Sequence, residues 1–125
     1  MDRSAAPLIE DAVERGMAVF NAAPFGGGLL ARGSASGATY AYTDAPPELL
    51  AWVARVEALC ADHGIDLPTA ALQFSLRSPL VDSTVVGISS IKRIAQLERM
   101  RTTDVPASFW DDLADLGTPP STITD

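Results

Sequence analysis

The sequence has 125 residues, of which 47% are hydrophobic and 20% are charged. This length and balance predict one globular unit, residues 1–125, with a single core. The formal net charge is −7 and no long basic block occurs, so nucleic acid and anionic membrane surfaces are poor candidates as partners. The single cysteine, Cys60, excludes an intrachain disulfide and favours a reducing, cytoplasmic setting. With no leader pattern and no membrane-length apolar run, we expect a soluble chain.

The first half of the chain predicts a helix, a strand and a loop. Apolar residues recur at helical spacing over residues 5–15, and Gly16 stands where helices commonly end, which predicts a short amphipathic helix. The apolar run MAVF at residues 17–20 predicts a buried strand. Residues 21–47 contain too many glycines, serines and prolines for one continuous helix or strand, and predict a long loop.

The middle of the chain predicts two consecutive helices and a second strand. Pro46 and Pro47 open an amphipathic pattern that runs to Gly64 and predicts the clearest helix of the chain. A second helix is expected from residue 68 to about residue 77, because Pro79 follows it. The β-branched stretch STVVG, residues 83–87, predicts another buried strand.

The last third of the chain predicts two more helices. Ser89 or Ser90 can cap the first of them, and its apolar side would carry Ile91, Ile94, Leu97 and Met100. The final helix is expected to begin at Ser108, which has capping-box spacing with Asp111, and to end near Gly117.

This order of elements predicts an α/β fold with parallel strands. Strands separated by helices are expected to pair in parallel through a right-handed crossover. Two strands alone leave both outer edges of the sheet unpaired, which natural sheets avoid. The sequence therefore predicts that the strands pair with another chain or belong to a larger sheet.

Residues 86–93, VGISSIKR, combine a strand end, a glycine, two serines and the first turn of a helix that carries Lys92 and Arg93. Backbone N–H groups at a helix start, hydroxyls and a guanidinium together suit a phosphate. The alternative is a capped helix whose basic residues are only solvated. The glycines at positions 26–28 could likewise admit a ligand to the backbone or form a flexible loop; they lead into further loop residues and do not match the dinucleotide pattern.

Three stretches of the sequence resemble, in order and separation, the carboxyl-terminal half of aldo-keto reductases: NAAPFGGGLL, PPELLAWVARVEALCADHGIDLPTAALQFSL and VVGISSIKRIAQLE. The sequences of the segments APPELL and AALQF are most similar to those of the aldose dehydrogenase branch, which comprises the fucose, galactose and threo-aldose dehydrogenases. The resemblance covers about residues 8–116. It implies a partial (β/α)8 TIM barrel that consists of strands seven and eight with their helices.

The resemblance also implies cofactor-binding residues. In the family, the loop after the seventh strand lies along the pyrophosphate and nicotinamide of the cofactor, which corresponds here to Ala22, Ala23, Phe25 and Gly27. The loop and helix after the eighth strand hold the adenosine 2′-phosphate and adenine, which corresponds to Gly87, Ile88, Ser89, Arg93 and Gln96. The implied cofactor is NADP or NAD, and VGISSIKR would be the segment that binds its phosphate. Two positions depart from the family: Ala22 replaces a stacking aromatic residue, and Leu97 replaces an asparagine.

The family's catalytic residues are absent. Aldo-keto reductases transfer a hydride between nicotinamide and a carbonyl carbon, with a tyrosine tuned by a lysine and an aspartate, and with a histidine that orients the substrate. In the family these residues come from earlier strands of the barrel. The sole lysine and the sole histidine here, Lys92 and His63, lie on predicted helices outside that catalytic group. The resemblance implies aldose oxidation to a lactone by the whole enzyme and no turnover by this chain. The alternative is a non-catalytic nucleotide-binding or interaction module that pairs with another chain, or a homo-oligomer formed through its strand edges.

Other residues that attract attention have structural interpretations. Tyr40 and Tyr42 lie in the long loop and would cover apolar surface or contact a sugar. Cys60 and His63 lie one turn apart on the predicted long helix, where core packing and a helix end explain them better than a catalytic dyad. Trp52 and Trp110 are expected as apolar anchors. The acidic residues of the last helix predict a solvated face and not a metal site: Asp111, Asp112 and Asp115.

Overall fold

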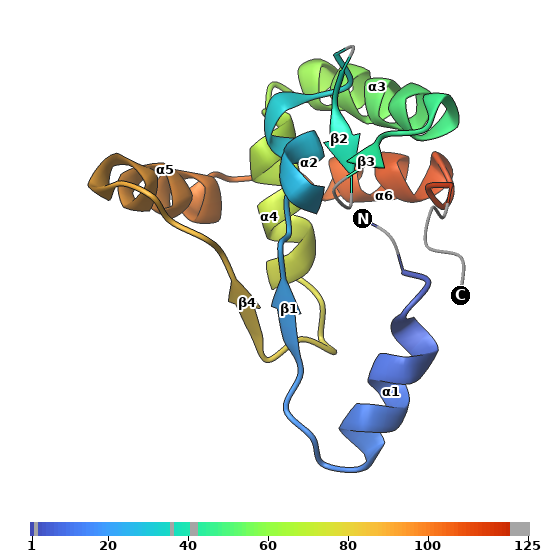
Figure 1. Cartoon of the computed structure of the whole chain (residues 1–125), viewed down its shortest axis with the longest axis vertical. Helices are drawn as coiled ribbons and strands as arrows, with labels where there is room; N and C mark the ends of the chain where they lie inside the picture. Colours follow the sequence, from blue (N-terminus) through green and yellow to red (C-terminus); the bar gives the residue numbers. More distant parts are fainter. Residues whose placement is uncertain (2, 36, 41–42, 121–125) are drawn as a thin grey trace.

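The computed structural model describes residues 1, 3–35, 37–40 and 43–120 (Figure 1). Its elements follow one another in this order: α1 (Ala6–Glu14), β1 (Phe20–Ala22), η1 (Gly26–Gly28), α2 (Leu29–Arg32), β2 (Thr39–Tyr40), β3 (Thr43–Asp44), α3 (Pro47–Asp62), α4 (Leu67–Leu76), β4 (Ser83–Val85), α5 (Ile91–Thr102) and α6 (Ala107–Asp115). The fold is α/β, as the sequence predicts. The described strands do not close a barrel.

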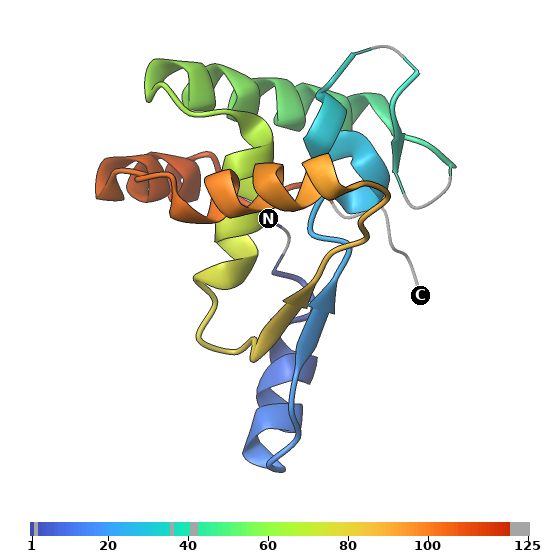
Figure 2. The same ribbon diagram turned by 90° about the vertical axis from the view of Figure 1, so that its left-hand side faces the viewer.

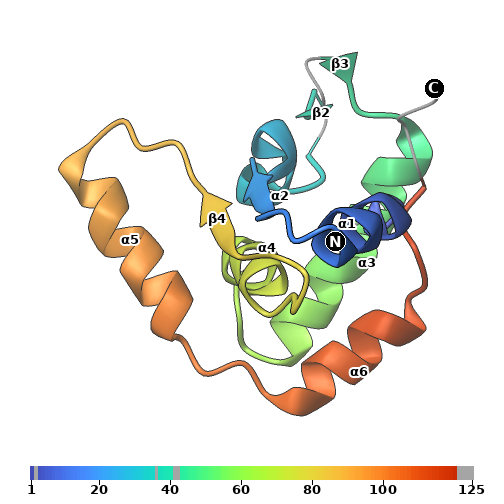
Figure 3. The same cartoon turned by 90° about the horizontal axis from the view of Figure 1, so that it is seen from below.

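Helices supply most of the core. Figures 1 and 3 show α4 at the centre, with α3 and α6 on one side and α5 on the other. The long helix α3 directs an apolar stripe inward, and every residue of that stripe is buried: Leu49, Trp52, Val53, Val56 and Cys60. Phe109 of α6 is fully buried against the same core. Both α3 and α4 begin and end within two residues of their predicted bounds, because their apolar periodicity and their flanking Pro and Gly residues act locally.

The predicted parallel pairing is confirmed. β1 pairs with β4 in parallel, with Asn21 opposite Thr84 at the centre of the ladder. The starts of the two strands are held together: the Val19 N–H donates to the Asp82 carboxylate at 2.8 Å, and the Asp82 N–H donates to the Val19 carbonyl at 2.9 Å.

The first strand begins three residues later than the sequence predicts. The backbone N–H of Met17 donates to the carbonyl of Ala12 at 3.0 Å and closes the end of α1 together with Gly16, whose φ is 73°. This closure is typical of helix ends that finish in a left-handed glycine. Met17 therefore belongs to the helix end, and the run MAVF is only partly a strand.

The long loop predicted for residues 21–47 contains more regular structure than expected. The glycines at positions 26, 27 and 28 all have positive φ, at 56°, 66° and 105°. They turn the chain directly into α2, whose Leu29 and Leu30 are buried. A short antiparallel pair, β2 with β3, follows. The prediction that residues 29–31 continue a loop is wrong, because periodicity is not visible over a four-residue helix.

Two helix starts differ in detail from the sequence prediction. Ser90 occupies the cap position of α5 as predicted, but its side chain makes no capping hydrogen bond. The predicted capping box at Ser108 is wrong, since α6 begins at Ala107 with Pro106 at the cap position. The Pro106 carbonyl accepts from the Phe109 N–H at 3.1 Å, so the first turn forms without a side-chain cap.

The exposure of the two strands is the largest difference between the structure and the sequence prediction. Both strands were expected to be buried, yet Phe20 is 64% exposed and Val85 is 53% exposed. Helix α1 has no buried residue, and Ile91 and Ile94 of α5 are also exposed. Leu97 and Met100 do pack against the core, as the apolar pattern predicts. No helix among the described residues is both long and apolar enough to cross a membrane.

Candidate cofactor-binding site

The two stretches that the sequence singles out meet at the carboxyl end of the β1–β4 sheet. Because β1 and β4 run in parallel, the loops that follow them leave from the same end of the ladder, as Figures 1 and 2 show. Ligands of parallel α/β folds bind at the carboxyl ends of the strands. The topology therefore places both predicted cofactor stretches where such a ligand would lie.

The loop after β1 is tightly bent. Ala22 ends the strand and is exposed, and Ala23 has a φ of 54°, the only positive φ of a non-glycine residue in the part of the chain that the structure describes. Such a backbone is strained, and strained residues are frequent at ligand sites. Phe25 turns inward and is buried, whereas Gly27 is exposed.

The loop after β4 is exposed at each of its three predicted residues, Gly87, Ile88 and Ser89. It leads into α5, a helix of 12 residues whose start has no side-chain cap. In contrast, the carboxylate of Asp66 caps α4 by accepting from the Thr69 N–H at 2.7 Å. The uncapped start of α5 leaves its first N–H groups available to an anion.

A contact between the two loops joins the halves of the predicted site. The guanidinium of Arg93 lies over the ring of Phe25, with its central carbon 5.0 Å from the ring centroid. Arg93 Nη1 also donates to Gln96 Oε1 at 3.4 Å. The structure thus brings Phe25, Arg93 and Gln96 together from segments that lie about 70 residues apart in the sequence.

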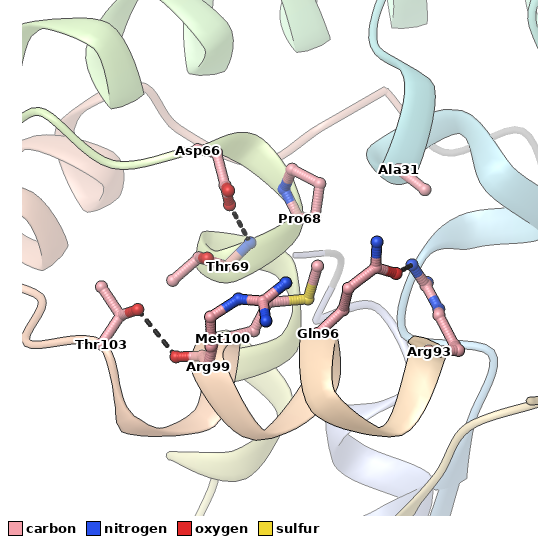
Figure 4. A pocket seen from close by; sticks show the side chains of 9 residues that line it. All are labelled: Ala31, Asp66, Pro68, Thr69, Arg93, Gln96, Arg99, Met100 and Thr103. Carbon is pink, nitrogen blue, oxygen red and sulfur yellow. Dashed lines mark hydrogen bonds between the residues drawn. The ribbon is translucent and has the colours of Figure 1, made fainter. Parts of the chain in front are cut away.

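Arg93 and Gln96 line a cleft of about 490 Å³ between α5, α2 and the start of α4. Figure 4 shows the side chains of Arg93, Gln96 and Arg99 projecting from α5 toward this start, where Asp66 faces them. The complete lining is Ala31, Asp66, Pro68, Thr69, Arg93, Gln96, Arg99, Met100 and Thr103. The sequence reading missed Arg99, although the three-residue spacing of Arg93, Gln96 and Arg99 on a helix was a usable signal.

These residues fit the phosphate-bearing end of a nicotinamide dinucleotide better than its nicotinamide end. Two guanidinium groups and an uncapped helix start suit phosphate oxygens. At the other end, Ala22 offers no ring to stack on a nicotinamide. A second cleft of about 360 Å³, lined by Gln73, Leu76, Arg77 and Arg101, contains none of the predicted cofactor residues.

The cysteine and the histidine have structural roles. Burial, followed by the negative charges of Asp66 and Glu57, raises the pKa of the Cys60 thiol to about 11, so the thiol is protonated and inert near neutral pH. His63 Nε2 lies 2.8 Å from an Asp112 carboxylate oxygen and connects the end of α3 to α6. The structural interpretation of Cys60 as a core residue is confirmed.

The remaining candidates also pack or lie exposed. Trp52 is buried, and Trp110 lies under the guanidinium of Arg77, whose central carbon is 4.7 Å from the ring centroid. The ring of Tyr40 packs against Gly26, while Tyr42 lies outside the described residues. Among the described residues, no group of three or more His, Cys, Asp or Glu side chains could hold a metal ion.

Comparison with known proteins identifies the family to which the chain belongs. The model of the aldo/keto reductase family matches residues 1–117, and the chain belongs to that family. It is 34% identical over 113 residues to the D-threo-aldose 1-dehydrogenase of a Pseudomonas species, covering 90% of this chain and 34% of the relative. It is also 34% identical over 106 residues to the pyridoxal 4-dehydrogenase of Microbacterium luteolum, covering 85% of this chain and 31% of the relative. The chain thus spans about a third of the length of these relatives.

Proposed function

We propose that this chain is the cofactor-binding part of an aldo-keto reductase and corresponds to strands seven and eight of the barrel with their helices. The whole enzyme would oxidise an aldose at its hemiacetal carbon to the lactone, and the nicotinamide of NADP or NAD would accept the hydride. Family membership and the name of the threo-aldose dehydrogenase relative support this proposal. A cytoplasmic location is part of it, in keeping with a single buried thiol.

The contact of Arg93 with Phe25 carries the proposal. Two segments that resemble cofactor-binding segments of the family meet at the carboxyl ends of parallel strands, where the guanidinium carbon of Arg93 lies 5.0 Å from the centroid of the Phe25 ring. A bound nucleotide would draw the guanidinium of Arg93 toward its phosphate, since a charge-assisted hydrogen bond is stronger than a contact with a ring face. The loop residues Ala22, Ala23 and Gly27, and Gly87, Ile88 and Ser89 across from them, would border the rest of the dinucleotide.

The proposal is tested by titration of the purified chain with NADP and with NAD, monitored by tryptophan fluorescence and thermal unfolding. A ligand that binds only the folded form stabilises it by about 2.7 kcal/mol at a concentration of 100 times Kd. We expect saturable stabilisation by at least one of the two nucleotides. In Arg93→Ala, loss of a charge-assisted hydrogen bond should weaken binding by about 10- to 100-fold.

Arg101→Ala is the matched control. Arg101 lies on the same helix, is exposed, pairs with Glu98 at 2.7 Å and does not line the cleft that contains Arg93. Nucleotide binding should therefore be unchanged in this variant. A folded chain that binds neither nucleotide, or equal losses in both variants, would contradict the proposal.

A second candidate function is a non-catalytic module that pairs with another chain. The observation that favours it is the two-stranded parallel sheet, in which β1 and β4 pair with no further strand among the described residues. Size-exclusion chromatography separates the two cases at low cost. A clean monomer with a sharp melting transition would count against an obligate partner.

A further inference from the structure

A carboxylate from helix α3 contacts the turn that ends α2. Glu57 Oε2 accepts a hydrogen bond from the backbone N–H of Ser34 at 3.3 Å, and a second one from the Ser34 hydroxyl. Glu57 and Ser34 are partly buried, and Gly33 beside them is buried. Glu57 does not line the cleft that contains Arg93, so direct contact with a nucleotide in that cleft does not account for this arrangement.

Position 33 admits this carboxylate because it is a glycine. Gly33 has a φ of 90°, a backbone conformation that residues with a side chain rarely adopt. A Cβ atom added there would overlap Glu57 Oε1. The glycine and the carboxylate therefore fit one another, and Glu57 anchors the end of α2 as a partly buried acceptor of two hydrogen bonds.

Backbone hydrogen bonds connect this anchored turn to Phe25. At the end of α2, the Gly33 N–H donates to the Leu29 carbonyl at 2.8 Å. At its start, the Leu30 N–H donates to the Phe25 carbonyl at 3.0 Å. The helix has only 4 residues, and its two leucines are buried. Because α2 is barely more than one turn long, a shift at the end that Glu57 holds is transmitted to Phe25.

We propose that Glu57 is a positioning residue for the nucleotide site: it fixes α2, and through α2 it holds Phe25 against the guanidinium of Arg93. The ring of Phe25 restrains Arg93, whose guanidinium carbon lies 5.0 Å from the ring centroid. A side chain that is already held beside the cleft loses less conformational freedom when a phosphate binds. The inference rests on the proposed function, because it concerns the same site.

A purely structural role for Glu57 leads to a different expectation. If Glu57 only stabilised the fold, its loss would lower the melting temperature and leave the contact of Arg93 with Phe25 intact in the folded chain. If Glu57 positions Phe25, the contact itself loosens. The Arg93 Nε–H proton reports this contact in NMR spectra without any ligand, because the ring current of Phe25 shifts its resonance. Phe25→Leu removes the ring and supplies the unshifted reference position.

The test compares Glu57→Met with the wild type by NMR and by titration with NADP and NAD. Methionine keeps the length of the side chain and removes the acceptor oxygens. We expect the Arg93 resonance to move toward its position in Phe25→Leu, and nucleotide binding to weaken by about 3- to 30-fold. Glu57→Gln keeps one acceptor oxygen and should restore the affinity to within about threefold of the wild type.

Ser34→Ala removes one donor to the same carboxylate, and it carries the same test if Glu57→Met does not fold. Because the two side chains act through one contact, the double variant should bind nucleotide no more weakly than Glu57→Met alone. Glu48→Met is the matched control, since Glu48 is an exposed glutamate in the first turn of the same helix. Its Arg93 resonance and its affinity should equal those of the wild type.

The outcomes separate this inference from the proposed function. An Arg93 resonance that is the same in Glu57→Met, Ser34→Ala and the wild type would overturn the inference, whether or not a nucleotide binds. A shifted resonance with unchanged nucleotide affinity would overturn it as well. A folded wild-type chain that binds neither nucleotide contradicts the proposed function instead, and the Arg93 resonance still decides whether Glu57 holds Phe25 in place.

Discussion

Cys60 illustrates how surroundings change the chemistry of one side chain. It is 2% exposed on the inner face of α3, and desolvation together with the nearby Asp66 and Glu57 raises the pKa of its thiol from 9.0 to about 11. The folded chain therefore retains a proton that the unfolded chain releases between these two values. A reactive cysteine would show the opposite shift, so Cys60 is a packing residue.

This shift predicts a pH dependence of stability. The contribution of the thiol to the free energy of unfolding is fully present below pH 9 and is lost as the pH rises toward about 11. In this window the thiol ionises in the unfolded chain and stays protonated in the folded chain. The loss should be on the order of 2 kcal/mol in the free energy of unfolding, measured by urea denaturation at a series of pH values. Cys60→Ala should show a flatter profile, and identical slopes in the two proteins would contradict the prediction.

At the scale of elements, α5 is held to the core mainly by its second half. Gln73 of α4 donates from Nε2 to the carbonyls of Met100 and Thr103, each at 2.7 Å, and Leu97 and Met100 pack against the core. The first half carries the exposed Ile91 and Ile94. The proposed phosphate-binding segment therefore lies at the end of α5 that has fewer contacts with the core.

Removal of the Gln73 amide should loosen α5 selectively. Gln73→Met keeps the length of the side chain and leaves the last carbonyls of the helix to water, which costs roughly 1 to 2 kcal/mol for the two hydrogen bonds. We expect backbone amides of α5 to exchange with deuterium about tenfold faster or more, as measured by mass spectrometry. Amides of α3 serve as the internal reference, and an equal acceleration in both helices would indicate global destabilisation instead.

For the whole molecule, we predict that the isolated chain shows no turnover. Hydride transfer to NADP or NAD needs a positioned general base for the sugar hydroxyl, which the resemblance to the family assigns to a tyrosine tuned by a lysine. The sole lysine of this chain lies on the exposed start of α5, and the sole histidine is bound to Asp112. No reduced nicotinamide should accumulate when the chain is incubated with aldoses and either cofactor. Steady formation of NADPH or NADH by the pure chain would refute this prediction.

The elements were more predictable than the site. The periodicity of α3 and α4 and the parallel pairing of β1 with β4 followed from local patterns and from the alternation of strands with helices. The four-residue helix α2 escaped prediction because it spans barely one turn. In the site, Arg93 and Gln96 came from resemblance to the family. The helical spacing of Arg99 from these two residues was visible in the sequence, but only the cleft between α5 and α4 shows that Arg99 lines the same site.

The sequence by itself determined the longer helices α3 and α4, the direction of strand pairing and the family, since each depends on the order and spacing of residues along the chain. Only the tertiary structure decided which side chains are covered. MAVF and STVVG contain the residues of buried strands, yet Phe20 and Val85 are exposed because no described element packs on that face. The stacking of Arg93 on Phe25 likewise depends on a neighbour distant in sequence, whose position no local pattern encodes. The raised pKa of Cys60 depends first on burial, which only the packed core provides.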